Sequence, residues 1–247
     1  MSSEINRFDG RAINECRPIT IEPGFMPNAE GSALVRLGDT HVICTATVEL
    51  DVPRWMRGRG TGWVTAEYGM LPRSTDQRID RRRASTSGRS REIERLIGRS
   101  LRAITDMAAL GECSITIDCD VLRADGGTRT ASITGGYVAL EQAIKSLQHK
   151  RGEDNRVLTD TVAAISVGIV DGRCVLDLPY EEDSRAEVDM NVVMTGSGDY
   201  VEIQGTAEAE PFTAIQLQEM LDLARIGCDS MKNEQLDALV RGAESIT

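Results

Sequence analysis

The change of hydrophobic period between residues 113 and 147 constrains the fold more than any other feature of this sequence. Over residues 113–121 apolar and polar side chains alternate, which is typical of a strand with one buried face. Two adjacent glycines, Gly126 and Gly127, follow this strand, and a helical pattern then runs over residues 131–147. This order of strand, glycine-rich turn and long helix favours a fold in which helices cross over between strands.

Short apolar runs predict further strands along the chain. The expected strands outside this segment lie near residues 19–21, 33–37, 41–48, 63–66, 161–170, 173–178, 186–194 and 200–205. The second and third of these flank a Gly38-Asp39 turn and are expected to form a hairpin. The rest of the stretch 54–87 is rich in Gly and Arg and has little periodicity, so it is expected to form a long loop.

Two further helices are expected, one from Ser90 to Met107 with Gly111 beyond its end, and a final one from about Pro211. The final helix is expected to break near Gly227. Groups of strands separated by a few long helices favour an α+β fold over a doubly wound sheet. No linker separates independent domains, so the 247 residues are expected to form one large domain.

Composition argues against several classes of protein. Hydrophobic residues make up 40% of the chain, which is enough for a buried core, and the charged residues are interspersed with apolar runs, unlike a disordered chain. No window approaches the ~20 consecutive apolar residues of a bilayer-crossing helix, and the start lacks a signal-peptide pattern. Six scattered cysteines and two histidines offer little material for a structural zinc site or a Cys/His nucleophile pair. We therefore expect a cytoplasmic protein in which oxygen atoms hold any metal ion.

Positive charge is concentrated in one part of the chain. The net charge is −11, but residues 54–102 contain thirteen arginines, no lysine and five acidic residues, a local net charge of +8 that leaves −19 elsewhere. Because arginine presents a planar pair of donors that suits phosphate groups, this block predicts one anion-binding face. Aromatic residues are only 4% of the chain, which indicates a nucleic acid held by its backbone rather than by stacking.

Two predicted helix starts carry groups that suit an anion. The run from Gly126 to Arg129 offers free backbone amides, the positive end of a helix dipole and a guanidinium group. Arg89 lies at the start of another helix, where a cation is locally unfavourable unless a bound anion offsets its charge. The first run lacks the spacing and the lysine of a P-loop, so an NTPase is not supported. A tight strand-to-helix connection and a solvent-screened arginine are the simpler alternatives.

Acidic residues gather in a later segment. Asp183 follows two glutamates, Glu181 and Glu182, and Asp189 lies in the next predicted strand. One face of that strand carries Glu187, Asp189 and Asn191, and the other carries Val188, Met190 and Val192. Converging carboxylates suit Mg²⁺ or Mn²⁺, which neutralise phosphate charge in phosphoryl transfer, although a solvated polar strand face is the alternative. Together with the two helix starts, these carboxylates predict phosphoryl chemistry on a nucleic acid.

Seven stretches of the chain, in order, form recognisable motifs: FDGRAINECRPITI, AEGSALVRLGDTHVICTATVE, GRGTGWVTAEYGMLPRST, EIERLIGRSLRA, DCDVLRADGGTRTASITGGYVAL, EEDSRAEVDMNVVMT and EIQGTAEAEPF. With these motifs, the chain resembles the ribonuclease PH family of exoribonucleases. The resemblance implies a two-layer α+β fold like that of a ribosomal protein domain, with βαβ units and a left-handed crossover, an exception to the usual hand. It also implies one domain over residues 1–247 with two related halves, roughly 17–147 and 158–240, and a homo-hexamer built as a trimer of dimers.

The resemblance implies a reaction as well. Members of the family use inorganic phosphate to remove nucleotides from the 3′ ends of tRNA precursors and release nucleoside 5′-diphosphates, a reversible nucleotidyl transfer, and ribosomal RNA is a further candidate substrate. The implied phosphate-binding residues are Arg89, Gly127, Thr128 and Arg129. The implied catalytic residues, which also hold Mg²⁺ or Mn²⁺, are Asp183 and Asp189, and the implied tRNA-binding residues are Arg73, Arg78 and Arg81.

The chain departs from the family pattern between Arg81 and Arg89, where the loop is shorter and lacks the expected Gly/Lys-rich run, and it carries a few extra residues before Arg7. Two other functions compete with this one: a metal-dependent hydrolase that releases nucleoside monophosphates, and an inactive ring subunit that only binds RNA. The presence of both arginines, the threonine and both aspartates together favours an active enzyme.

Overall fold

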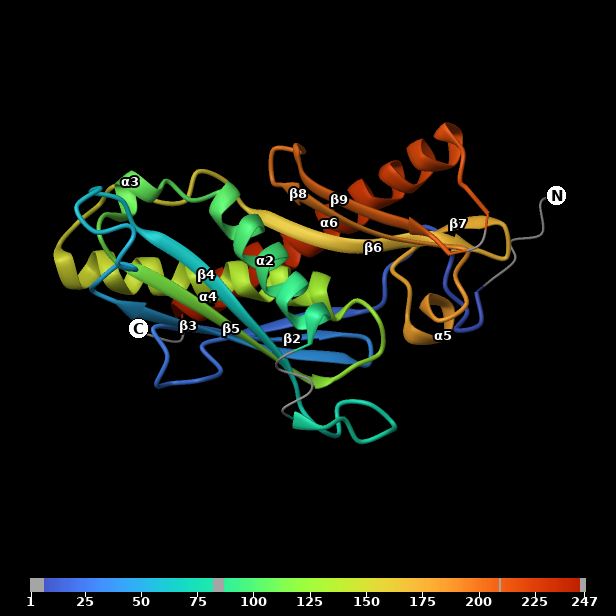
Figure 1. Ribbon diagram of the computed structural model, residues 1–247, viewed down its shortest axis with the longest axis horizontal. Coiled ribbons are helices and arrows are strands. Elements are labelled where there is room, and N and C mark those ends of the chain that lie inside the picture. Colours follow the sequence, from blue (N-terminus) through green and yellow to red (C-terminus); the bar gives the residue numbers. More distant parts are fainter. Residues whose placement is uncertain (1–6, 82–86, 209, 245–247) are drawn as a thin grey trace.

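The computed structural model describes residues 7–81, 87–208 and 210–244, and it contains two β-sheets with helices packed on them (Figure 1). The strand order is β1-β2-β3-β5-β4 in the first sheet and β7-β6-β8-β9 in the second. The strands are β1 (Ile19–Pro23), β2 (Gly31–Leu37), β3 (Thr40–Glu49), β4 (Trp63–Met70), β5 (Ser114–Arg123), β6 (Val162–Val170), β7 (Arg173–Leu176), β8 (Val188–Thr195) and β9 (Tyr200–Ala207). The helices are α2 (Gly88–Ala103), α3 (Met107–Leu110), α4 (Thr128–Arg151), α5 (Tyr180–Asp183) and α6 (Ala214–Glu244). This arrangement confirms the predicted α+β class.

Helix α4 is the centre of the fold because both sheets pack against it. It contacts β2, β3 and β5 of the first sheet and β6 of the second, and fifteen of its residues are buried. Its small and apolar residues surround the helix axis rather than forming a stripe, as expected for a helix that is covered on most sides. At Gly135 a Cβ atom would lie 2.4 Å from Cγ2 of Val35, so the glycine allows α4 to approach the first sheet closely.

The second sheet is covered on both faces. Helix α6 packs against β6, β7 and β8, and the core between them includes Ile165, Met190 and Met220. On the opposite face, Ala164 of β6 and Val193 of β8 belong to the core around α4. The alternative of a solvated polar face on β8 is therefore wrong, because Asn191 and Val193 on that face are buried and Asp189 is half-buried.

The first sheet contains one parallel pair, β4 and β5, and α2 connects the two strands. This is the predicted βαβ unit, and the hand of its crossover stays a prediction. Since parallel strands end at the same edge of a sheet, the segments after β4 and β5 leave it side by side. The Leu71 amide donates to the Val121 carbonyl (3.0 Å), and the Ala124 amide donates to the Ser74 carbonyl (2.8 Å).

The first two helices differ from the prediction of one helix from Ser90 to Met107. Helix α2 begins earlier, at Gly88, because the Ser87 side chain accepts a hydrogen bond from the Ser90 amide (3.1 Å). It ends at Ala103, and the Asp106 carboxylate then accepts from the Ala108 and Ala109 amides to start α3. An aspartate that caps a new helix competes with continuation of the old one.

Helix α6 does not break at Gly227, which contradicts the prediction. A Cβ atom at Gly227 would lie 2.8 Å from side-chain carbons of both Ile165 and Leu176, so the glycine serves close packing of the helix on the second sheet. Strand β4 is longer than the four residues expected, because its pairing with β5 continues to Met70. The predicted hairpin of β2 and β3 is confirmed.

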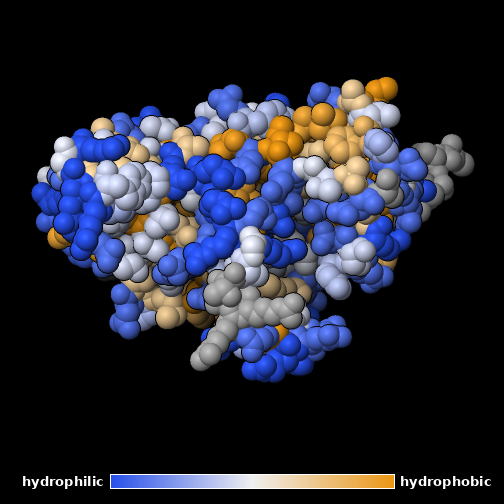
Figure 2. All heavy atoms as spheres, viewed as in Figure 1, coloured by the Kyte–Doolittle hydropathy of each residue, from blue (hydrophilic) through white to orange (hydrophobic). Residues whose placement is uncertain are grey.

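The face of the molecule seen in Figure 2 has a hydrophobic and a hydrophilic region. Figure 2 shows hydrophobic residues gathered over β9 and the start of α6 and a mostly hydrophilic surface over α2; the exposed apolar side chains include Tyr200, Ile203 and Ile215. In residues 7–81, 87–208 and 210–244, no helix has the length and hydropathy needed to span a bilayer. All six cysteines are free thiols.

Candidate active site

The two glycines before α4 form a tight turn between β5 and the helix. Gly126 and Gly127 have φ angles of 70° and 67°, in the left-handed region that favours glycine. A Cβ atom on Gly126 would lie 2.4 Å from the Leu178 carbonyl oxygen, so this turn also packs directly on the chain that leads to α5. No side chain caps the start of α4, and its first amides are the kind of donors that bind an anion.

Arg129 is the second residue of α4, and two polar side chains hold its guanidinium group. Its Nη1 donates to Oε1 of Gln204 (2.7 Å) and lies 3.6 Å from Oε1 of Glu92, while Nε2 of Gln204 donates to the same Glu92 oxygen (2.9 Å). Gln204 and Glu92 were missed by sequence reasoning as residues of the site, although both lie in stretches that resemble the family. Because the Arg129 side chain is only 15% exposed, this bracing fixes its direction.

Arg89 enters the same region from the start of α2. Tyr68 of β4 lies between the two helix starts, where its hydroxyl is hydrogen-bonded to the Thr128 hydroxyl (2.8 Å). Burial raises the pKa of Tyr68, and the positive charges of Arg89 and Arg129 act in the opposite direction. Both guanidinium groups therefore lie close enough to act on one buried phenol, and Thr128 is beside it.

The two predicted catalytic carboxylates face the same region. Asp183 ends α5, and Asp189 is the second residue of β8. Burial raises the pKa of Asp183, and Arg89 and Arg129 oppose that rise. Burial and then the nearby Asp183 raise the pKa of Asp189 to about 6, again against the same two arginines. The structure thus brings Arg89, Gly127, Thr128, Arg129, Asp183 and Asp189 together from five separate elements and turns.

The other acidic residues of this segment do not join them. Glu181 is exposed, and Glu182 is buried in an ion pair with Arg7. Asn191, on the same strand face as Asp189, is only 6% exposed. The observed convergence of carboxylates therefore differs from the expectation. In addition to burial, Asp183 and Glu208, which follows β9, raise the pKa of Asp189. Glu187 instead accepts a hydrogen bond from the Gly172 amide (3.0 Å).

The donor set of Asp183 and Asp189 fits a small divalent cation. Both carboxylates are half-buried, and besides this burial the charge of Asp183 raises the pKa of Asp189. A cation bound beside them would relieve this repulsion. In the described part of the chain, no group of three or more His, Cys, Asp or Glu residues is arranged to hold a metal ion. Mg²⁺ commonly takes one or two protein carboxylates and completes its shell with substrate phosphates and water, so a two-carboxylate site suits it.

The predicted RNA-binding arginines are exposed to solvent, unlike the Arg129 side chain. Arg73, Arg78 and Arg81 are all exposed, on the segment that follows β4. The hydrogen bond between Ala124 and Ser74 fastens the start of this segment beside the Gly126-Gly127 turn. Arg81 lowers the pKa of Asp120 at the end of β5, against the larger effect of burial, so it lies over the same sheet edge. The departure from the family pattern, with residues 82–86, lies outside the described residues, as do the extra residues before Arg7.

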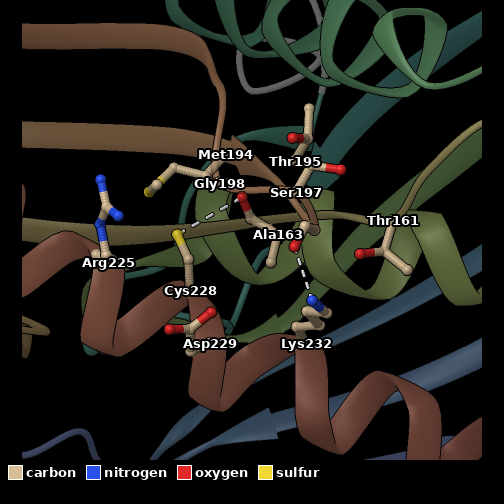
Figure 3. Close-up of a pocket in the computed structure, with 11 residues that line it drawn as sticks. Thr161, Ala163, Met194, Thr195, Ser197, Gly198, Arg225, Cys228, Asp229 and Lys232 are labelled. Atoms are coloured by element: carbon tan, nitrogen blue, oxygen red, sulfur yellow. Dashed lines mark hydrogen bonds between the residues drawn. The ribbon is translucent and has the colours of Figure 1, made fainter.

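A cavity of about 170 Å³ lies elsewhere, between α6 and the turn that joins β8 to β9 (Figure 3). Nζ of Lys232 donates to the Gly196 carbonyl at its rim (2.7 Å), and Arg225 and Cys228 also line it. Burial raises the pKa of the Cys228 thiol to about 12, so the thiol is protonated and unreactive at neutral pH. The cavity contains none of the predicted site residues and lies at the opposite end of β8 from Asp189.

Comparison with known proteins places this geometry in a family. Sequence models of the 3′ exoribonuclease family match residues 15–145 as domain 1 and residues 160–227 as domain 2. Ribonuclease PH of Corynebacterium glutamicum strain R is 57% identical over 96% of this chain and 98% of its own length. Ribonuclease PH of Rhodospirillum rubrum is 55% identical over 94% of this chain and 98% of its own.

Solved structures share the fold at much lower identity. An Archaeoglobus fulgidus exosome with RNA bound to the active site superposes with a TM-score of 0.80 at 22% identity, over 93% of this chain and 92% of that one. Rice (Oryza sativa) Rrp46 gives a TM-score of 0.76 at 18% identity, over 94% of this chain and all of the other. The sequence identities decide the family: the chain belongs to the ribonuclease PH family of 3′ exoribonucleases, which confirms the expected phosphorolytic 3′-to-5′ exoribonuclease activity.

Proposed function

We propose that the chain trims the 3′ ends of tRNA precursors, with inorganic phosphate bound between Arg89 and Arg129 as the nucleophile. The observation that carries this proposal is that two guanidinium groups from two helix starts face one pair of carboxylates. Thr128 and the first amides of α4 complete a set of donors for the phosphate oxygens. Fixed donors of this kind hold the nucleophile and stabilise the charge that spreads over the equatorial oxygens in the transition state.

In the proposed reaction, a phosphate oxygen attacks the phosphorus of the last phosphodiester. The new P–O bond forms as the bond from that phosphorus to the 3′ oxygen of the preceding nucleotide breaks. The products are a nucleoside 5′-diphosphate and an RNA that is one nucleotide shorter. The proton that the attacking phosphate loses goes to the departing 3′ oxygen, and Asp189 is the residue that we propose relays it.

Asp183 and Asp189 are the residues that would hold Mg²⁺, with Mn²⁺ as a substitute. When bound, the ion supplies positive charge to the oxygens of the scissile phosphate. Asp183 belongs to α5 and Asp189 to β8, so the two carboxylates that would hold the ion come from different elements.

Arg73, Arg78 and Arg81 are proposed to hold the tRNA body by its phosphates, outside the site. Their exposure and their sheet edge beside the Gly126-Gly127 turn support this role. We further propose that the chain works as a homo-hexamer, a trimer of dimers, as its resemblance to the family implies. The Archaeoglobus fulgidus exosome, whose fold this chain shares, has RNA bound to its active site, which supports RNA as the substrate.

The test is incubation of the protein with a 3′-extended tRNA and Mg²⁺, with and without inorganic phosphate, followed by identification of the released nucleotide. Nucleoside diphosphates that form only with phosphate support the proposal. Nucleoside monophosphates formed equally well without phosphate would mean hydrolysis by water. Binding without any release would mean an inactive RNA-binding subunit, and elution of fully active protein at monomer size would contradict the hexamer.

A further inference from the structure

The two ends of the candidate site belong to segments that are far apart in the sequence. The donors for phosphate follow the Gly126-Gly127 turn, whereas Asp183 lies at the end of the four-residue helix α5. So short a helix has little stability of its own, because helix formation needs several turns or tertiary contacts. Something outside α5 must therefore fix the direction in which Asp183 points.

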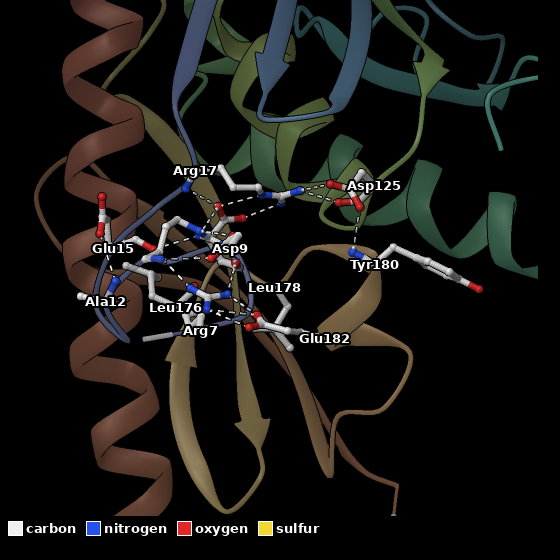
Figure 4. Close-up of polar contacts among 12 residues, drawn as sticks. Arg7, Asp9, Ala12, Glu15, Arg17, Asp125, Leu176, Leu178, Tyr180 and Glu182 are labelled. Atoms are coloured by element: carbon white, nitrogen blue, oxygen red, sulfur yellow. Dashed lines mark hydrogen bonds and ion pairs between the residues drawn. The ribbon is translucent and has the colours of Figure 1, made fainter. Parts of the chain in front are cut away.

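Asp125, the residue before the two glycines, makes that contact (Figure 4). Its Oδ1 accepts a hydrogen bond from the Tyr180 amide, the first amide of α5 (3.1 Å). The residue that precedes α5, Pro179, offers no side-chain cap, so Asp125 supplies from a distance the acceptor that a capping residue usually provides. A carboxylate at this end of a helix also interacts favourably with the helix dipole.

Arg17 holds Asp125 in place through its guanidinium group. Its Nη1 donates to the Asp125 carbonyl oxygen and lies 3.4 Å from Oδ2 of the same residue. The rest of the guanidinium group binds Asp177, with 2.9 Å from Nε to Oδ2 and 2.6 Å from Nη2 to Oδ1. Asp177 leads into α5 and has no exposed surface. One buried guanidinium group therefore joins the chain before the glycine turn to the chain before α5.

The two segments also touch through their backbones. Gly126 packs against Leu178, Pro179 and Tyr180 so closely that any side chain would collide with them. Without the Asp125 side chain, this packing and Arg17 would still hold the turn. The first amide of α5 would lose its acceptor, whereas the buried ion pair of Glu182 with Arg7 would remain, so the start of the helix that carries Asp183 would be held less firmly.

We propose that Asp125 is a positioning residue that fixes Asp183, and through it the bound cation, relative to the phosphate site. Asp125 touches neither phosphate nor RNA in this account; it acts through the Tyr180 amide. The inference rests on the proposed function, because it assumes that Asp183 is a metal ligand. Loss of Asp125 is expected to weaken cation binding at Asp183 and to leave phosphate binding by Arg89 and Arg129 largely unchanged.

The experiment compares Asp125→Ala with Asp125→Asn, which keeps an oxygen acceptor for the Tyr180 amide. For Asp125→Ala we expect the Mg²⁺ concentration for half-maximal activity to rise about tenfold or more and kcat to fall about tenfold, since small misplacements of reacting groups are costly. KM for phosphate is expected to change less than about threefold, because Arg89, Thr128 and Arg129 do not depend on α5. Asp125→Asn is expected to stay within about threefold of the parent chain in all three quantities.

Amide hydrogen exchange tests the same inference in a measurement that needs neither bound metal nor enzyme turnover. The Tyr180 amide and its neighbours in α5 are expected to exchange at least about tenfold faster in Asp125→Ala and at the parent rate in Asp125→Asn. Asp160→Ala is the matched control, because Asp160 also bridges two segments: it accepts from the amides of Thr161 (2.7 Å) and Ser197 (2.9 Å), at the other end of the second sheet. This control is expected to change exchange at Ser197 but neither α5 nor the Mg²⁺ dependence.

Three results would overturn the inference. They are parent-like Mg²⁺ dependence in Asp125→Ala, unchanged exchange in α5, and equal damage in Asp125→Asn, which would assign the effect to charge rather than to the hydrogen bond. A rise in KM for phosphate equal to the fall in kcat, with a lower melting temperature, would also count against it, because it would mean general loss of structure. Asp183→Asn separates the two proposals: if it keeps full Mg²⁺-dependent activity, the proposed metal site fails, whatever Asp125 does.

Discussion

The glycine turn before α4 and the arginine segment after β4 leave the same edge of the first sheet, yet they are built in opposite ways. The turn is held by left-handed glycines, by backbone packing on Leu178 and by the buried Arg17. The three arginines of the neighbouring segment are exposed to solvent. A fixed set of donors suits a small anion that must react in one orientation, whereas mobile charges suit an RNA of variable shape. The contrast predicts that changes in the turn affect chemistry and changes in the segment affect RNA binding.

The largest effect is expected for Arg129→Ala. Loss of one fixed charge at the reacting phosphate is expected to lower kcat/KM for phosphorolysis about 100-fold or more. The dissociation constant for RNA, measured by filter binding, is expected to change less than threefold. Arg99→Ala is the control, since Arg99 lies on α2 in an exposed ion pair with Glu202 (2.8 Å) and is expected to leave both quantities unchanged. Equal losses of turnover and RNA affinity in Arg129→Ala would break the contrast between the two regions.

A smaller effect, on stability, is expected for Gly126→Ala. The added Cβ atom meets both the strain of a positive φ and a collision with the Leu178 carbonyl. Gly58→Ala is the matched control, because Gly58 has a φ of 76° with no atom within 4 Å of the added carbon. Left-handed strain alone costs about 1–2 kcal/mol of unfolding free energy, and overpacking adds roughly 1–3 kcal/mol. Urea titration should therefore find Gly126→Ala the less stable of the two; equal stabilities would mean that the turn is not packed as described.

The three exposed arginines of the segment after β4 are expected to contribute together to tRNA binding. Replacing Arg73, Arg78 and Arg81 together by alanine is expected to weaken tRNA binding and to reduce the slope of log affinity against log salt by about 2, the value for three lost phosphate contacts at about 0.7 each. Phosphorolysis of a short oligonucleotide is expected to stay within about threefold of the parent rate. An unchanged salt slope would remove these residues from the RNA-binding surface.

The smallest expected effect is on the pH dependence of stability, and it comes from the buried ion pair between Arg17 and Asp177. Although burial acts to raise it, hydrogen bonds and charge from Arg17 hold the pKa of Asp177 below its usual value. A group whose pKa is lowered on folding stabilises the protein above its unfolded pKa, about 3.9 for Asp, and that stability is lost as pH falls through the folded pKa. The free energy of unfolding is therefore expected to fall below about pH 4.

Asp177→Asn tests the origin of this acid loss. The variant is expected to be less stable than the parent at pH 7, because it leaves buried guanidinium charge without its partner, and to lose less stability between pH 5 and pH 3. Parallel curves for the two proteins, measured by urea denaturation across this range, would show that other carboxylates cause the acid loss.

The glycine turn also shows what the sequence could predict. Adjacent glycines between a strand and a helix indicated a tight turn and a helix start with free amides, because these are local properties. Arg89 and Arg129 could be selected for the same reason. The partners that brace them could not: Gln204 lies 75 residues from Arg129, and Tyr180 lies 55 residues from Asp125. Contacts of this kind follow from how the sheets pack, which no local pattern contains.

The errors have the same cause. Alternation on β8 suggested a solvated face as one alternative, but Asn191 and Val193 on that face are buried. Gly227 was expected to break a helix, and instead it lets α6 approach β6 closely. In both cases tertiary packing overrides the local preference of the residues. The family motifs, rather than periodicity, indicated Asp183 and Asp189 among the many acidic residues of the chain.

The central claim is that phosphate seated between Arg89 and Arg129 cleaves the RNA. The most direct measurement supplies radiolabelled orthophosphate with a 3′-extended tRNA and locates the label in the products. The account predicts nucleoside diphosphates labelled only at the β-phosphate from the parent chain and no labelled nucleotide from Arg89→Ala. Release of unlabelled monophosphates by the parent chain, or full labelling by the variant, would contradict it.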